Sequence, residues 1–166
     1  MEIEQPVVEF AGFTLAVCAA IASGNEIGEV LCPFALTQKN GKNNIVAFES
    51  ESQSESVNKA YESFSSLSHD SDFWAIAHEG LITENEKKID VFTIVAWAKG
   101  MEEKITIIKR FNPKSESNAF SMFGNTELIV EGKWLEDPTH PFIVEAISKG
   151  ISCHLKAKEN WSQWHL

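Results

Sequence analysis

Residues 89–98, Ile-Asp-Val-Phe-Thr-Ile-Val-Ala-Trp-Ala, decide the fold class of this 166-residue chain. The side chains of a β-strand alternate between two faces. Here both faces are mostly apolar: one carries Val91, Val95 and Trp97, and the other carries Phe92, Ile94 and Ala96. Because a strand that is apolar on both faces is covered on both sides, the stretch predicts a central strand with helices packed on each face of its sheet.

Strand-like runs on either side of this stretch predict an antiparallel sheet. Residues 73–83, 105–111 and about 126–131 are rich in apolar residues, and polar turns or loops separate them. Short turns join antiparallel strands, whereas parallel strands need a long crossover connection. We therefore expect four consecutive antiparallel strands in the second half of the chain.

A further hairpin is predicted between residues 29–38 and 44–50. These runs flank Asn40-Gly41, a dipeptide that tolerates the positive φ angles of a tight hairpin turn. Pairing about the turn sets two pairs of residues opposite each other, Phe34 with Ala47 and Leu36 with Ile45. Pro33 has no N–H to donate, so we expect its strand to lie at a sheet edge or to bulge there.

Three helices complete the expected order. Residues 7–22 form an alanine-rich run whose apolar side chains surround most of the circumference, which predicts a buried core helix. Residues 52–67 begin with capping-box spacing and carry an apolar stripe at the helical period. A last helix follows His140-Pro141, with apolar positions through Leu155 facing inward, and Gly150 weakens it by about 1 kcal/mol relative to alanine.

The expected order is therefore α-ββ-α-ββββ-α, where α stands for a helix and β for a strand. We predict an α+β fold with a predominantly antiparallel sheet of about six strands and three helices. A chain of 166 residues is close to the usual size of one domain with its own core. We therefore expect a single domain over residues 1–166.

The apolar run near the N-terminus also resembles the hydrophobic part of a secretory signal peptide. Residues 1–5 are acidic, however, and no Lys or Arg precedes Lys39, whereas a signal peptide carries positive charge ahead of its apolar run. The run is interrupted by Glu9 and is shorter than the ~20 residues that span a bilayer. We therefore expect a cytoplasmic protein that does not enter a membrane. Its three cysteines are typical of reduced, buried thiols: Cys18, Cys32 and Cys153.

The net charge of −10 is concentrated in the first half of the chain. Residues 1–86 contain 14 acidic residues and three lysines, a net of −11, whereas residues 87–166 contain the other 10 acids and 11 bases, a net of +1. Nucleic-acid binding requires clustered Lys and Arg, and Arg110 is the single arginine. The composition therefore argues against nucleic acid as a partner and favours a basic protein.

The helix predicted over residues 52–67 is the surface that we expect to meet such a partner. Its polar face and flanking turns carry five acidic residues: Glu51, Glu55, Glu62, Asp70 and Asp72. A solvated helix face with no partner explains the same pattern. Trp161 and Trp164 form a second candidate contact, because tryptophan is enriched in binding hot spots. The alternative for this tail is that it folds back onto the core of its own domain.

His78, Glu79 and Asp90 are the best candidates for acid–base catalysis. His78 is in phase with Trp74 along its strand, and Asp90 is in phase with Phe92 along the neighbouring strand. A buried carboxyl group near an imidazole would have a shifted pKa, which is typical of catalytic pairs. The alternative is a structural role, with His78 as a hydrogen-bonded core residue and Asp90 beyond the core at a strand end.

Motifs for other chemistry carry little weight in this sequence. Residues 56–59 match the S-x-x-K pattern of acyl-transfer enzymes, but about one such match is expected by chance with this many serines and lysines. Cys153 and His154 would point apart on a helix, so they cannot readily chelate one zinc ion. A turn explains Asp70 and Asp72 better than a hard cation does. We therefore expect no metal and no cofactor.

Two functions remain open. The first is a non-catalytic, immunity- or antitoxin-like domain whose acidic helix face binds a basic protein. The second is a small-molecule-binding or hydrolytic domain with a pocket between sheet and helix, served by the His78 group. The sequence favours the first slightly and leaves enzymatic activity uncertain. An exposed edge at the strand of Pro33 would permit a dimer.

Overall fold

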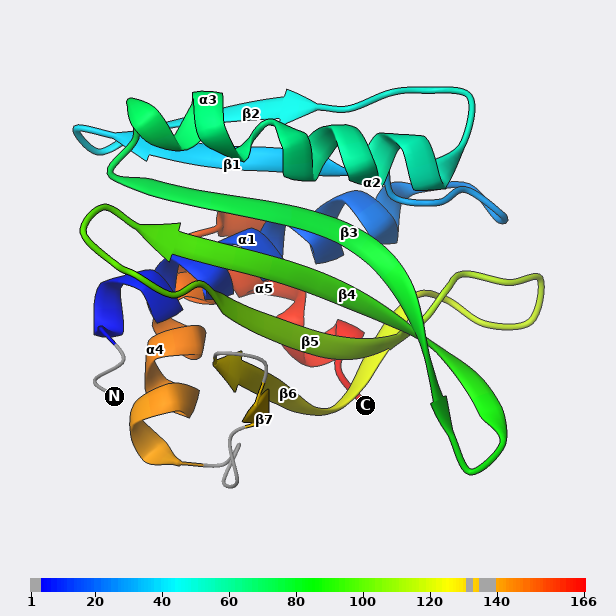
Figure 1. The fold of residues 1–166 in the computed structure, drawn as a ribbon. Coiled ribbons are helices and arrows are strands. Elements are labelled where there is room, and N and C mark those ends of the chain that lie inside the picture. The colour runs from blue at the N-terminus through cyan, green and yellow to red at the C-terminus, as the bar shows by residue number, and fades with distance from the viewer. Residues whose placement is uncertain (1–3, 131–132, 135–139) are drawn as a thin grey trace.

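The computed structural model describes residues 4–130, 133–134 and 140–166 of the chain. Their strands form one antiparallel sheet in the order β2-β1-β3-β4-β5-β6-β7. In chain order the strands are β1 (Phe34–Lys39), β2 (Lys42–Ala47), β3 (Phe73–Glu84), β4 (Lys87–Ala98), β5 (Ile105–Asn112), β6 (Ser121–Val130) and β7 (Lys133–Trp134). The helices are α1 (Gln5–Gly24), α2 (Gln53–Glu62), α3 (Phe64–His69), α4 (Pro141–Ser152) and α5 (Leu155–Trp164). The predicted α+β class with a mainly antiparallel sheet is confirmed (Figure 1).

Two of the expected helices are each divided in the structure. The helix expected over residues 52–67 is interrupted at Ser63, whose hydroxyl donates to the carbonyl of Ala60 at 2.5 Å. The last helix is interrupted at residues 153–154, and α5 then begins with its own N-cap. Because the chain leaves the path of α4 there, Leu155 does not face inward as we expected but is 72% exposed.

β4 is the central strand that residues 89–98 predicted. It pairs with β3 on one side and with β5 on the other. Phe92 and Ile94 are fully buried in the core beneath α1, whereas Val95 packs in a second apolar cluster with residues of α2 and α3. Figure 1 shows α1 behind the sheet and α2 with α3 in front of it. The prediction of helices on both faces is confirmed.

The hairpin about Asn40-Gly41 has the predicted register, with Phe34 opposite Ala47 and Leu36 opposite Ile45. Both turn residues have positive φ, 51° and 77°, as a tight hairpin turn requires. Neither alternative expected for the strand of Pro33 is found: β1 lies between β2 and β3 rather than at a sheet edge, and its pairing with both neighbours has no register shift. β1 begins only after Pro33, whose carbonyl accepts from Phe48 N at 2.9 Å, so the missing N–H costs no bond of the strand ladder.

The strand ends differ from the sequence-based expectation at two further places. Residues 29–33 precede β1 as an irregular segment rather than as part of the strand. β6 begins at Ser121 rather than near Thr126, and residue 131, where we expected it to end, lies outside the described residues. The irregular segment matters for function, because it leads from the end of α1 into the sheet.

α1 is the buried core helix that its composition predicted. Most of its length is inaccessible to solvent, and it packs on β3 and β4 on one side and on α4 on the other. Among the described residues, α1 is the one helix that is long and apolar enough to span a membrane. The same apolar length is what a helix needs when it is enclosed on most of its sides by its own domain.

Two glycines bring the backbones of α1 and α4 into direct contact. A Cβ atom added at Gly150 would lie 1.9 Å from the carbonyl oxygen of Glu9, and one at Gly12 would lie 2.4 Å from that of Ile147. Neither position has room for any side chain. Gly150 therefore does not only weaken its helix, as its low helix propensity indicates, because it also permits the close crossing of the two helices.

The three cysteines are free thiols in different environments. Cys18 on α1 is fully buried, and burial raises the pKa of its thiol. Cys32 is half-buried and Cys153 is exposed. The expectation of buried thiols is therefore right for Cys18 and wrong for Cys153, which lies at the surface where α4 ends.

We predict that Gly150→Ala lowers the free energy of unfolding by about 2 kcal/mol, the usual scale of overpacking, although alanine is the better helix former. Gly24→Ala is the matched control, because an added Cβ there would meet only the end of the Lys156 side chain at 3.9 Å. Urea denaturation of both variants measures the difference. An unchanged or raised stability of Gly150→Ala would contradict the tight crossing of α1 and α4.

Candidate functional site

The three candidate acid–base residues lie on two faces of the sheet. His78 and Glu79 are neighbours along β3, so their side chains point to opposite faces. Glu79 lies opposite Phe92 on β4, and Asp90 lies opposite Leu81 on β3. Glu79 and Asp90 are therefore diagonal neighbours on the face of α1, where Cβ atoms are typically roughly 7 Å apart. The structure brings these two carboxyl groups together and leaves His78 on the other face.

His78 joins α2 to the sheet through both ring nitrogens. Its Nδ1 lies 2.9 Å from the backbone oxygen of Glu79, and its Nε2 lies 2.9 Å from the hydroxyl of Tyr61. A carbonyl oxygen only accepts, so Nδ1 donates to it, and in the neutral ring Nε2 accepts from the tyrosine hydroxyl. Burial raises the pKa of Tyr61, which keeps the hydroxyl available as a donor. The two contacts are those of a structural role, which was the alternative to acid–base catalysis for His78.

Glu79 and Asp90 line a cleft of about 360 Å³, which we call the acidic cleft. Residues 25–30, which follow α1, form one of its walls. Phe111 on β5, together with Pro113, Lys114 and Phe120 of the loop before β6, lines the rest. Its volume is within the range of small-ligand pockets. Two of the three acid–base candidates, Glu79 and Asp90, thus line one cleft, and its walls are the segment after α1 and the loop before β6.

The two carboxyl groups of the acidic cleft are poorly solvated. Burial raises the pKa of Glu79, and the negative charge of Asp90 raises it further, while a hydrogen bond from Leu31 N to Glu79 Oε1 (2.9 Å) acts in the opposite direction. Burial also raises the pKa of Asp90. Two half-buried carboxylates that repel each other are stabilised by a bound cation.

Apolar groups form the rest of the acidic cleft. Phe111 is 3% exposed and stacks on Phe92, with ring centroids 4.1 Å apart. Ile27 and Val30 on the opposite wall are 56% and 53% exposed, which is unusual for large apolar side chains. Such walls suit the aliphatic or aromatic part of a ligand. The cleft can therefore hold a group with a positive end and an apolar stem.

One lysine is also present at the acidic cleft. Lys114 Nζ donates to the backbone oxygen of Asn25 at 2.9 Å and so connects the loop before β6 to the end of α1. The cleft is therefore not uniformly negative, and a cationic ligand would have to reach the carboxylates at a distance from this ammonium group. The contact also fixes the two walls of the cleft relative to each other.

The acidic residues expected to bind a partner fall into two groups. Glu51, Glu55 and Glu62 are exposed at or along α2. Asp70 forms an ion pair with Lys39, and Asp72 Oδ2 accepts from the backbone N–H of Asn40 at 2.9 Å. These aspartates hold the turn of the β1–β2 hairpin against the segment before β3. Of these five residues, the two aspartates each use a carboxylate oxygen within the chain, which leaves the three glutamates as the candidates for contact with a partner.

The segment before α2 contacts the segment between α1 and β1. Phe48 lies three residues before Glu51. Its N–H donates to the carbonyl of Pro33, and its own carbonyl accepts from the Cys32 thiol at 3.6 Å. The charge of Glu49 accordingly contributes to the raised pKa of Cys32, after burial. Figure 1 shows the segments after α1 and before α2 at the same end of the molecule. The acidic residues of both segments therefore share that end.

The two C-terminal tryptophans pack on the core of their own chain. Trp164 is 9% exposed, and its ring meets that of Phe120 edge-on at a centroid distance of 6.2 Å. Trp161 is half-buried against the same core. The tail therefore supports the wall of the acidic cleft from behind, and the ring of Trp164 offers little surface to a partner.

Lys109 on β5 is a buried polar residue that the sequence analysis did not single out. It is 3% exposed, and its ammonium donates to the carbonyl of Gly124 and to Nε2 of His165 at 2.6 Å. Burial, with a smaller contribution from the charge of Arg110, lowers the pKa of Lys109 to about 8. The sequence did carry a signal for this burial, because Lys109 alternates in phase with Ile107 and Phe111, which are both core residues.

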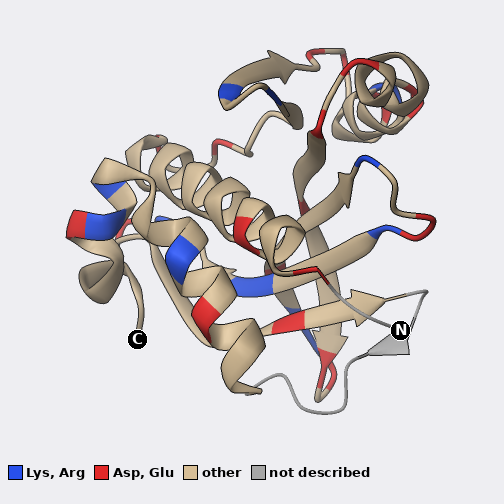
Figure 2. Cartoon of the chain, turned by 90° about the vertical axis from the view of Figure 1, so that its left-hand side faces the viewer, with Lys and Arg blue, Asp and Glu red and all other residues tan. Residues whose placement is uncertain are grey.

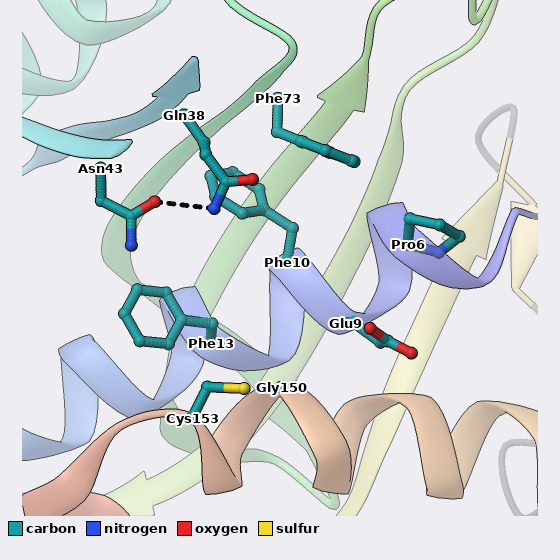
Figure 3. A pocket seen from close by; sticks show the side chains of 9 residues that line it. All are labelled: Pro6, Glu9, Phe10, Phe13, Gln38, Asn43, Phe73, Gly150 and Cys153. Atoms are coloured by element: carbon teal, nitrogen blue, oxygen red, sulfur yellow. Dashed lines mark hydrogen bonds between the residues drawn. The ribbon is translucent and has the colours of Figure 1, made fainter. Parts of the chain in front are cut away.

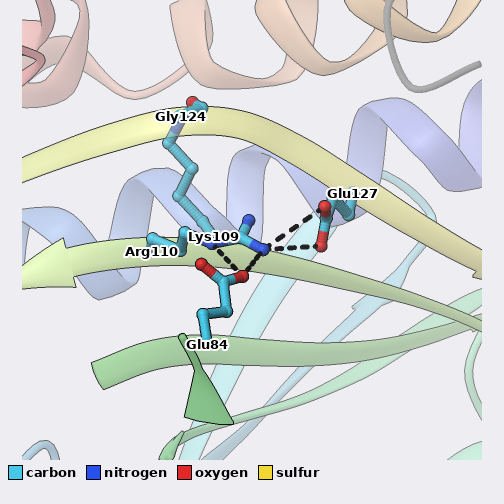
Figure 4. Close-up of polar contacts among 5 residues, drawn as sticks. All are labelled: Glu84, Lys109, Arg110, Gly124 and Glu127. Atoms are coloured by element: carbon cyan, nitrogen blue, oxygen red, sulfur yellow. Dashed lines mark hydrogen bonds and ion pairs between the residues drawn. The ribbon is translucent and has the colours of Figure 1, made fainter. Parts of the chain in front are cut away.

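A break in the strand register sets Lys109 apart from Arg110. The pairing of β5 with β6 shifts between Ile108 and Arg110. Figure 4 shows Lys109 extending toward Gly124, whereas Arg110 binds Glu84 and Glu127. Arg110 is thus neutralised by two carboxylates at the surface, and Lys109 is enclosed by the C-terminal residues. Bulges of this kind often redirect a side chain.

The described residues contain no group of three or more His, Cys, Asp or Glu side chains arranged to hold a metal ion. A pair of carboxylates with apolar walls suits an organic cation better than calcium or magnesium, each of which takes six or more ligands that are mostly oxygen atoms. Comparisons of the chain with protein-family models, with curated proteins and with solved structures give no match. The case for a function therefore rests on the geometry of the acidic cleft and the surfaces around it.

We predict that the free energy of unfolding of the wild type increases relative to that of Lys109→Met as the pH increases from about 8 to 10. The lysine pKa is about 8 in the folded chain against 10.5 when exposed, so folding releases a proton in this window and becomes more favourable with pH. The gain is at most on the order of 3 kcal/mol. Urea denaturation across this range measures it, and Lys158→Met, on the exposed side of α5, is the control that should not alter the trend.

Proposed function

We propose that this chain is a non-catalytic binding domain for a basic protein, and that the acidic cleft receives a cationic side chain of that partner. The observation that carries the proposal is the pairing of Glu79 and Asp90 in one cleft, both half-buried and both with raised pKa values. Lysine and arginine side chains combine a positive end with an apolar stem. They therefore match both the carboxylates and the apolar walls of the cleft.

The acidic surface next to the cleft supports a protein partner rather than a free amine. Glu26 and Glu29 line the cleft itself, and Glu51 and Glu55 are exposed at the start of α2. A lopsided negative field of this kind speeds the encounter with a basic protein and fixes its orientation. Figure 2 shows Lys and Arg dispersed over separate helices, strands and turns, which supports the argument against a nucleic-acid partner.

The placement of His78 supports a binding role over a catalytic one. A general base and its carboxylate partner must lie within hydrogen-bonding reach of the same substrate, and His78 projects from the opposite face to Glu79 and Asp90. The proposal also includes a cytoplasmic location. Removal of α1 as a signal peptide would take away the helix that packs on β3, β4 and α4.

A second candidate is that the partner binds the exposed face of α2 without using the cleft. Glu51, Glu55 and Glu62 support it, because all three are exposed. The two possibilities differ in which carboxylates matter. Neutralising Asp90 weakens binding only when the cleft is used, whereas reversing the charges of Glu55 and Glu62 weakens binding only when α2 is used.

We expect a short oligolysine peptide with blocked ends to bind the wild-type protein at low salt. Glu79→Gln and Asp90→Asn should each weaken this binding about tenfold, because each removes a poorly solvated negative charge. Glu145→Gln, exposed on α4 and outside both proposed surfaces, is the matched control and should change affinity less than about twofold. Isothermal titration calorimetry measures the constants, and an oligoglutamate peptide of equal length tests for non-specific binding.

The natural partner is identified by a pull-down from native lysate, with elution at low and then raised salt. A basic protein retained by the wild type and by Glu145→Gln but lost with Asp90→Asn supports the cleft. Retention of the same protein by Asp90→Asn, together with its loss when Glu55 and Glu62 are both changed to lysine, would replace the cleft with the α2 surface.

A further inference from the structure

β2 is an edge strand that offers one row of backbone groups to a further strand. Lys39 and Lys42 flank the two-residue turn and form a hydrogen-bonded pair, so the backbone groups of every second residue from Lys42 point toward β1. The bond from Phe48 N to Pro33 O has this phase. The N–H and C=O groups of Asn43, Ile45 and Ala47 therefore point away from the sheet.

The outer side of β2 lacks the features that usually prevent strand addition. Natural edge strands carry charged side chains, proline or a bulge. Residues 43–47 read Asn-Asn-Ile-Val-Ala, without a charge or a proline, and their register with β1 is uninterrupted. Ile45 is 51% exposed at the centre of this segment. The edge therefore combines unpaired backbone groups with an exposed apolar side chain.

An apolar groove of about 440 Å³ lies beneath this edge, on the side of α1. Phe13, Val17 and Ile21 of α1 line it together with Leu36 and Ile45. Ile21 is 40% exposed. The groove adjoins the cleft of Figure 3, where Gln38 donates to Asn43 and Phe13 lies below them. A strand added to β2 would cover this apolar surface.

The two ends of the β2 edge carry opposite charges. Lys42 begins the strand next to the turn, and Glu49 and Glu51 follow its other end, all three with exposed side chains. An antiparallel copy of the same segment brings the positive end of each chain to the negative end of the other. A parallel arrangement would instead place like charges side by side.

We propose that the chain forms a two-fold symmetric dimer in which the β2 strands of two copies pair in antiparallel orientation about Ile45. In this register Ile45 lies opposite Ile45 of the second copy, and Asn43 lies opposite Ala47 on each side of the axis. Each of these pairs exchanges two backbone hydrogen bonds. The two Ile45 side chains then meet over the apolar grooves, and the two sheets become one.

We assign a second copy of the chain to this edge because the edge of β2 is complementary to itself. A symmetric interface requires that each surface match itself under rotation, and the outward row, the central isoleucine and the opposite terminal charges all meet this requirement. The proposal does not depend on the acidic cleft. Changes at Glu79 or Asp90 should therefore leave the dimer intact.

Sedimentation velocity over a hundredfold range of concentration tests the proposal with the full chain. The wild type should sediment with twice the mass of one chain. Ile45→Pro removes an outward N–H without removing a bond to β1, and it should weaken the dimer at least about tenfold. Leu81→Lys is the control, because Leu81 is 60% exposed on β3 and distant from the edge in the strand order. Circular dichroism establishes that each variant is folded.

A charge exchange distinguishes this interface from any other. Lys42→Glu and Glu49→Lys should each weaken the dimer, and the double variant that carries both changes should restore it. A wild type that remains monomeric at the highest concentration overturns the proposal. A dimer that is unaffected by Ile45→Pro, or a double variant no better than its two single variants, overturns it as well.

Discussion

The rest of the structure depends on the close crossing of α1 and α4 at Gly12 and Gly150. Because neither position has room for a side chain, the helices meet through their backbones and α1 is pressed against β3 and β4. This contact fixes where α1 ends, and the segment that forms one wall of the acidic cleft begins at that end. The position of the cleft thus follows from a packing constraint on the opposite side of the helix. A shift of α1 would open or close the cleft without changing any residue in it.

The acidic cleft holds two carboxylates in an environment that disfavours their negative charge, and a cationic ligand would stabilise them. Glu79 and Asp90 are held on one face of adjacent strands, where burial disfavours the charged form of each and the charge of Asp90 further disfavours that of Glu79. Proteins often accept such a cost at the sites they use. The buried Lys109 is a different case, because its ammonium group has a carbonyl and an imidazole within hydrogen-bonding distance. The cleft therefore gives a stronger functional argument than the lysine does.

The parts of the fold that follow from local rules were predictable from the sequence. The apolar pattern of residues 89–98 indicated a central strand, and Asn40-Gly41 set the register of the β1–β2 hairpin. The alternation of a strand could also have shown that His78 and Glu79 cannot serve one site. The grouping of Glu79 with Asp90 needed the register of β3 with β4. The helix crossing at Gly150 and the hydrogen-bond partners of Lys109 could not be predicted, because both arise from elements that are distant in the sequence.

The central claim is that Glu79 and Asp90 form a cation-binding pair. It is tested most directly by measuring the pKa of each carboxyl group by carbon-detected NMR, in the free protein and with oligolysine present. The account predicts that both pKa values lie above their ordinary range in the free protein and fall when the peptide is added. Ordinary pKa values that the peptide leaves unchanged would contradict it.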